Sequence, residues 1–92
     1  MKKLKKLTRK GFKQWLGTQP ARKKVGISGN NWRCPIATFL GEEASVGWSH
    51  IFFNNETYET PVWARCFIEN VDHVTTINVS AGKALKILEE CK

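Results

Sequence analysis

Cys34 is the residue whose type and position most favour chemistry. It stands directly before Pro35, at the start of a short apolar segment. A thiol at a helix N-terminus, near several cations, has a lowered pKa and can act as a nucleophile. His50 or His73, oriented by Asp72, would then complete a Cys-His-Asp arrangement. A cysteine before proline is more often a small buried cap residue, so the sequence favours a structural role and predicts no enzyme.

Metal and phosphate sites with recognisable motifs are not predicted. The three cysteines and two histidines include no closely spaced pair of zinc ligands. The segment Gly26-Ile27-Ser28-Gly29-Asn30 differs from a nucleophile elbow, because asparagine stands where that motif needs glycine. Neither G-x-G-x-x-G nor a Walker loop occurs. We therefore expect no catalytic residue, no metal, no cofactor and no small-molecule substrate.

Positive charge is concentrated in the first quarter of the chain. The formal net charge is +7, yet residues 1–24 contain ten Lys or Arg and no acid, whereas residues 25–92 contain five against eight acids. Such a block attracts an anionic partner, although a solvated, partly frayed terminus has the same composition. Nucleic acid is the first candidate, then an acidic protein surface, or anionic lipid if a helix begins near residue 3. The candidate nucleic-acid-binding residues are Lys2, Lys3, Lys5, Lys6, Arg9, Lys10, Lys13, Arg22, Lys23 and Lys24.

An aromatic segment offers a second contact surface. Trp48, His50 and Phe52 alternate along a predicted strand and share one face, whereas Ile51 and Phe53 point to the other. Exposed rings can stack unpaired bases when a basic segment follows the phosphates. They can equally anchor a protein partner, or they can belong to the core. The first three residues are therefore candidate partner-binding residues.

The element that must organise the rest is a helix that begins after Thr60 as its cap. Pro61 suits the first helical turn, where its missing N–H costs nothing. Trp63, Phe67 and Val71 then recur every four residues and form one broad apolar stripe. This spacing predicts a central helix that other elements cover.

Three shorter helices are expected around the central one. Thr8 caps the first, and Gly17 is expected as the left-handed residue that ends it. Pro35 and Gly41 bracket a helix of two turns. Ser80 caps the last helix.

The expected strands are short. Residues 46–53 and 57–59 form a hairpin around Asn54-Asn55, which tolerates the positive φ of a tight turn. Residues 25–27 fit a brief edge strand, and the connector at 72–79 has room for one extended segment. The predicted fold is a basic tail at residues 1–7 followed by one α+β domain at residues 8–92. In this domain, four short helices pack with a two- or three-stranded antiparallel β-hairpin sheet.

Length and cysteine usage bound the class of protein. A chain of 92 residues has room for one core. The cysteines at 34, 66 and 91 are an odd number with no C-x-x-C pair, so no disulfide framework is predicted and Cys66 is assigned to packing. No secretory h-region follows the first lysines, and no run approaches the roughly 18 apolar residues of a membrane span. We expect a reduced, cytoplasmic protein.

Three motifs carry a family resemblance. They are Cys34-Pro35-Ile36-Ala37, Pro61-Val62-Trp63-Ala64-Arg65-Cys66-Phe67 and Ala84-Leu85-Lys86-Ile87-Leu88. With them the chain resembles a family of small uncharacterised bacterial proteins that is frequent in cyanobacteria. The likeness extends from about residue 12 to residue 90, and it implies no activity, cofactor or partner.

These features favour a small non-enzymatic binding module. Its basic N-terminal segment would contact an anionic partner, nucleic acid or a nucleoprotein first, with Trp48, His50 and Phe52 as a second contact. The alternative is a protein-binding regulator or inhibitor that uses the aromatic hairpin as its surface.

Overall fold

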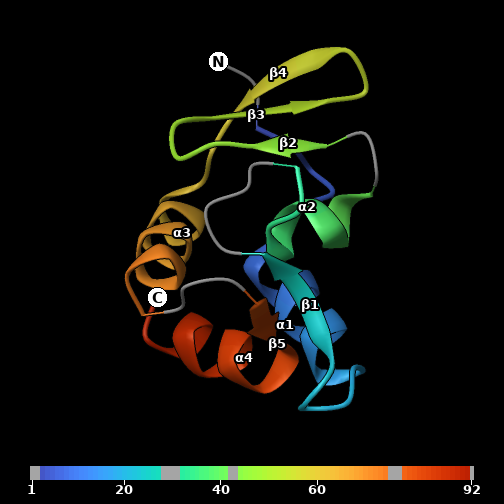
Figure 1. Ribbon diagram of the computed structural model, residues 1–92. Coiled ribbons are helices and arrows are strands. Elements are labelled where there is room, and N and C mark those ends of the chain that lie inside the picture. Colours follow the sequence, from blue (N-terminus) through green and yellow to red (C-terminus); the bar gives the residue numbers. More distant parts are fainter. Residues whose placement is uncertain (1–2, 28–31, 42–43, 75–77, 92) are drawn as a thin grey trace.

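The computed structural model describes residues 3–27, 32–41, 44–74 and 78–91, and these ranges contain four helices and two antiparallel sheets (Figure 1). This confirms the expected α+β class. In chain order the elements are α1 Arg9–Gly17, β1 Lys24–Ile27, α2 Pro35–Leu40, β2 Ser45–Val46, β3 His50–Phe53, β4 Glu56–Glu59, α3 Val62–Val74, β5 Asn78–Ser80 and α4 Ala81–Glu89.

The larger sheet has the strand order β2-β3-β4. Asn54 and Asn55 have φ angles of 52° and 62°, which confirms the tight turn predicted between β3 and β4. The single long strand predicted over residues 46–53 is wrong, because the chain turns back after Val46 and β2 pairs with β3. Val46 is therefore the partner of Ile51 and lies on the buried face with it.

The smaller sheet pairs β1 with β5. The brief strand predicted near residues 25–27 is confirmed, but its partner comes from the connector that follows α3, more than fifty positions further along the chain. The predicted antiparallel hairpin sheet is therefore present with three strands, and a second sheet accompanies it. α3 also continues to Val74 rather than ending near Val71.

β1 lies directly against the backbone that leads into α2. The Ile27 N–H donates to the Arg33 carbonyl at 2.7 Å. A Cβ atom on Gly26 would lie 2.5 Å from the Pro35 nitrogen and 2.7 Å from the Cys34 carbonyl carbon. Only glycine allows this close approach.

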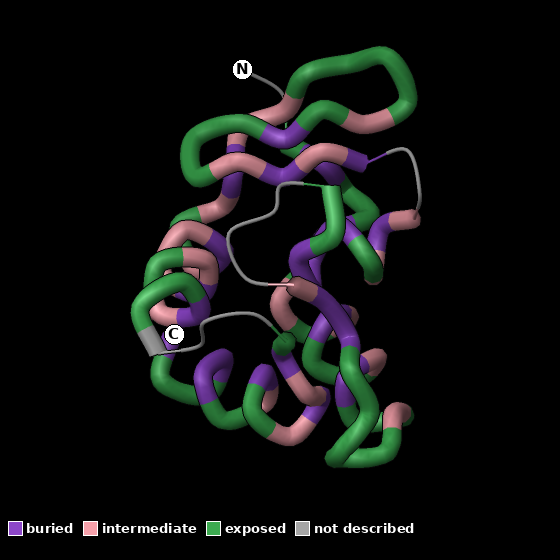
Figure 2. Tube along the Cα trace, in the orientation of Figure 1, coloured by how far each residue is buried: buried purple, intermediate pink, exposed green. Residues whose placement is uncertain are grey.

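Phe12 of α1 lies at the centre of the core, within an aromatic cluster. Its ring centroid is 5.2 Å from that of Phe67 in an edge-to-face contact, 5.5 Å from that of Phe39 and 5.9 Å from that of Trp63. Phe67 and Val71 are buried, as the apolar stripe predicts, whereas Trp63 is half-buried. Figure 2 shows that buried residues line the inner sides of the helices and strands.

Three of the predicted helix caps are present. The Thr8 hydroxyl accepts from the Gly11 N–H at 3.0 Å, and the Ser80 hydroxyl accepts from the Lys83 N–H at 3.3 Å. Cys34 caps α2, with Pro35 at the first helical position. Local residue types determine these ends.

Two predicted helix ends are wrong. Thr60 does not cap α3; it is only 1% exposed, and its hydroxyl donates to the Gly47 carbonyl at 2.9 Å, which holds the β4–α3 junction against the β2–β3 turn. Gly17 is not left-handed either, since α1 ends at Thr18 in the right-handed region. Gly41 does have the expected positive φ, at 124°.

Residues 3–7 lie against the body of the domain. Leu4 and Leu7 are 8% and 4% exposed, and Lys3 forms a parallel bridge with Glu59 of β4. This segment is not helical, so the lipid-binding helix considered from residue 3 does not form. No helix in the described ranges is both long and apolar enough to cross a membrane.

Candidate functional site

The Cys34 thiol is a structural cap rather than an activated nucleophile. It is 9% exposed, and its Sγ accepts from the Ala37 N–H at 3.4 Å. Burial raises the pKa of Cys34 above its ordinary value, and the charge of Asp72 adds to this, while backbone hydrogen bonds from Ala37 and Ile36 lower it to a smaller extent. The expected lowering of this pKa is therefore wrong, because desolvation outweighs the helix terminus.

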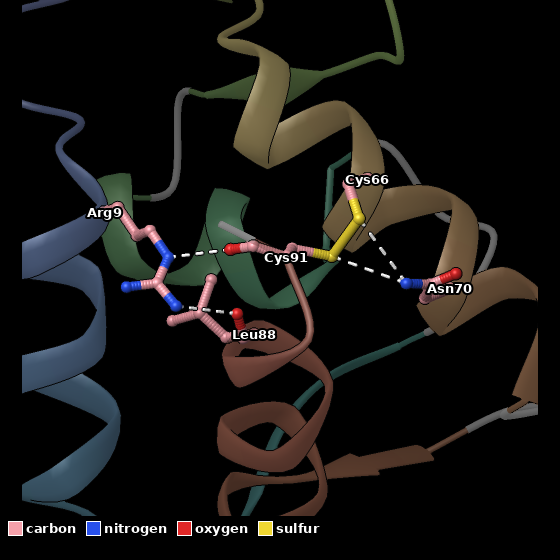
Figure 3. Close-up of a disulfide and its surroundings, with 5 residues drawn as sticks. All are labelled: Arg9, Cys66, Asn70, Leu88 and Cys91. Carbon is pink, nitrogen blue, oxygen red and sulfur yellow. Dashed lines mark hydrogen bonds between the residues drawn. A yellow bond between two sulfur atoms is a disulfide. The ribbon is translucent and has the colours of Figure 1, made fainter.

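Cys66 and Cys91 form a disulfide, which contradicts the expectation of three reduced cysteines (Figure 3). It joins α3 to the residue that follows the last turn of α4, with Cα atoms 5.8 Å apart. The Asn70 amide lies beside the bridge, its nitrogen 3.6 Å from one sulfur and 3.4 Å from the other. The cysteines therefore no longer support the expectation of a reducing compartment.

Among the described residues, no group of three or more His, Cys, Asp or Glu side chains could hold a metal ion.

Arg9 has a structural role within the basic segment. Its Nε donates to the Cys91 carbonyl at 2.8 Å, and a terminal nitrogen donates to the Leu88 carbonyl at 3.0 Å (Figure 3). These carbonyls belong to the end of α4, where a helix has unpaired acceptors and a cation is favourable. Arg9 therefore fastens α1 to α4.

The other described cations of this segment remain exposed. They are Lys3, Lys5, Lys6, Lys10, Lys13, Arg22, Lys23 and Lys24, while Lys2 lies outside the described residues. Lys6 donates to the Leu40 carbonyl at 3.1 Å, and its ammonium lies 5.3 Å from the centre of the Phe53 ring. Among the residues that the structure describes, an ion pair joins Arg65 and Glu59.

In space, the basic segment is not gathered at one end. The described chain starts beside β4, passes through α1, and reaches the α1–β1 connection at the opposite end of a molecule 34 Å long (Figure 1). The cations consequently divide into a group beside the larger sheet, Lys3, Lys5 and Lys6, and others further along. The charge that is contiguous in the sequence is therefore spread over the molecule, because residues 3–24 pack along the whole body.

One face of the larger sheet combines cations with exposed rings. Side chains of residues paired across a sheet lie on the same face. Lys3 pairs with Glu59, and Glu59 pairs with His50, so these three share a face with Phe52, two positions after His50. We call this surface, formed by Lys3, His50, Phe52 and Glu59, the outer face. Ile51, which is fully buried, lies on the other side.

Trp48 borders the outer face from the β2–β3 turn. The Arg65 guanidinium lies 4.9 Å from the centre of the indole ring, a distance typical of a cation–π contact, and pairs with Glu59 at 3.6 Å. Trp48 is nevertheless 49% exposed, and Phe52 is 44% exposed. The three aromatic candidates are thus near one another on the surface rather than in the core, and Figure 2 shows how much of the hairpin is exposed or half-buried.

Sequence reasoning missed Arg65 as a part of this surface. Its position in the apolar α3 pattern gives no signal, because its contacts with Trp48 and Glu59 join three elements that are separate in the sequence. The Nε of Arg65 is buried and lacks a hydrogen-bond partner within the described chain. Trp32, 57% exposed, was missed as well; with Lys24 and Arg33 it lines a separate open groove of about 790 Å³ between β1 and α2.

In comparisons with family models, curated proteins and solved structures, nothing matches this chain. The resemblance to small cyanobacterial proteins therefore stays a prediction. The functional argument depends on the contacts and exposure of this chain's own residues.

Proposed function

We propose that this protein is a non-enzymatic module that binds nucleic acid through the cations near its N-terminus. The observation that carries the proposal is the bridge between Lys3 and Glu59. It brings Lys3 to a sheet face where aromatic rings are exposed.

The combination of charges and rings favours nucleic acid over an acidic protein. Lysines neutralise phosphates and release counterions, which supplies affinity without sequence preference. Exposed rings add stacking contacts with bases, whereas the carboxylate side chains of an acidic surface carry no ring that could stack. The exposed lysines Lys3 and Lys5 meet the first requirement, and Trp48 and Phe52 meet the second.

The proposal predicts binding that weakens steeply with salt. Fluorescence anisotropy of a labelled oligonucleotide, titrated with the full chain over a series of KCl concentrations, measures the slope of log affinity against log salt. For single strands this slope should become more negative by about 0.7 for each lysine that contacts a phosphate. The double variant Lys3→Gln/Lys5→Gln should therefore bind less tightly and with a shallower slope than the wild type.

A matched control separates local contact from net charge. Lys83 and Lys86 are exposed on α4, so Lys83→Gln/Lys86→Gln removes the same charge from another surface. This variant should keep the wild-type slope. Affinity that is indifferent to salt, or equal losses in the two double variants, would contradict the proposed role of the N-terminal lysines.

The alternative, a protein-binding regulator or inhibitor, is supported by the apolar exposure near the β4–α3 junction. Val62 is 76% exposed, and Trp48 lies in the turn packed against this junction. Affinity capture from lysate with and without nuclease distinguishes the two functions. A partner that survives nuclease treatment and is lost on Trp48→Ala would favour the regulator.

A further inference from the structure

We infer that the nucleic acid is single-stranded and that its bases stack on Trp48 and Phe52 at the outer face of the larger sheet. This inference rests on the proposed function and adds the class of nucleic acid and the surface that contacts the bases. Three features of the structure lead to it: the state of the two rings, the position of the cations, and the shape of a sheet surface.

The two rings are available and one of them is held in place. About half of the surface of Trp48 is exposed although Arg65 lies over its ring. A guanidinium over one face of an indole restrains the ring while leaving other surface for a planar ligand. Phe52 projects from the middle of β3, and neither ring is paired with another described aromatic ring. Such rings can stack on bases of any identity.

Cations flank these rings on the same side of the sheet. Lys3 shares the outer face through its pairing with Glu59, and Arg65 reaches the same carboxylate from α3. Glu59 is the one acid among the outer-face residues, and its ion pair with Arg65 offsets its negative charge. A strand laid across β3 and β4 would place bases over Phe52 and phosphates near the Lys3 end.

The rings require unpaired bases. In a duplex the faces of the bases are already stacked on their neighbours, and rings at the surface of a sheet cannot reach them. A single strand exposes base faces and follows a positively charged surface. The outer face therefore fits a single strand better than a double helix.

The test compares labelled oligothymidylate with a duplex of the same length, using the full chain and fluorescence anisotropy at one fixed salt concentration. Trp48→Ala and Phe52→Ala should each weaken binding to the single strand by roughly 5- to 150-fold, the range for losing one base-stacking contact. Trp48→Phe keeps a ring and should retain most of the affinity. Trp32→Ala removes an exposed indole from the groove between β1 and α2, so this variant should keep the wild-type affinity for the single strand.

The outcomes separate this inference from the function on which it rests. Equal affinity for single strand and duplex, or full affinity of both alanine variants, overturns the stacking surface while the salt-dependent function stands. Failure of the wild type to bind either nucleic acid overturns both. Thermal unfolding of each variant checks the fold. If Trp48→Ala unfolds, Phe52→Ala decides, because its removal leaves the contact between Arg65 and Trp48 in place.

Discussion

At the scale of single residues, the basic segment divides into two kinds of cation. The Arg9 guanidinium donates hydrogen bonds to the carbonyls of Leu88 and Cys91 within the protein. Lys3 is exposed on the outer face and has no described ion pair. Arg9 and Lys3 are both cations within the first ten residues. Only their contacts distinguish a structural cation from one available to a ligand.

This difference predicts that substitutions at Arg9 and Lys3 affect stability differently. Arg9→Gln should lower the free energy of unfolding by about 1.5–3 kcal/mol, because it removes charge-assisted hydrogen bonds to two carbonyl groups at the end of α4. Lys3→Gln should leave stability nearly unchanged, as expected for an exposed surface position. Urea denaturation measures both, and a larger loss in Lys3→Gln would contradict the assignment.

The salt slope of nucleic-acid binding provides the complementary measurement for the same pair. In buffer without urea, where both variants are folded, Arg9→Gln should keep the wild-type slope of log affinity against log salt. Lys3→Gln should reduce this slope. A reduced slope in Arg9→Gln would show that its guanidinium leaves α4 to contact phosphate.

At the scale of elements, the close contact between β1 and the start of α2 depends on Gly26. Gly26→Ala should destabilise the protein by about 1–3 kcal/mol, because the added Cβ would meet backbone atoms of Cys34 and Pro35 that cannot move aside alone. Gly17→Ala is the matched control: nothing lies within 4 Å of its Cβ position, so alanine should be neutral or stabilise α1. Thermal unfolding of the two variants checks this, and equal midpoints would contradict the close approach.

The elements also show what a sequence can and cannot predict. Caps at Thr8 and Ser80, the bracket of α2 and the Asn54-Asn55 turn depend on neighbouring residues, and all were predicted. The pairing of β1 with β5 and the bridge from Lys3 to Glu59 join distant segments, so no local signal exists for them. The aromatic candidates were found from alternation alone, whereas their partner Arg65 became visible only when α3 was placed beside the β2–β3 turn.

At the scale of the whole molecule, the C-terminal end is fastened from two sides. The disulfide ties Cys91 to α3, and Arg9 ties the same residue to α1, so three helices meet at one short segment (Figure 3). Cys91 is buried there. The outer face is built from β3, β4 and the N-terminal residues. Arg65, which lies over Trp48, comes from α3, where it directly precedes Cys66.

This arrangement predicts that reduction lowers stability without abolishing nucleic-acid binding. The bridge closes a segment with a sequence separation of 25, and breaking it should lower the free energy of unfolding by about 3 kcal/mol through the entropy of the unfolded chain. Urea denaturation with and without dithiothreitol measures the loss. Cys66→Ala/Cys91→Ala should be destabilised and insensitive to the reductant, whereas Cys34→Ser, which leaves the bridge intact, should remain sensitive.

Reduced wild-type protein that is still folded should bind oligothymidylate with unchanged affinity, and a large loss of binding would show that the cross-linked end and the outer face are coupled.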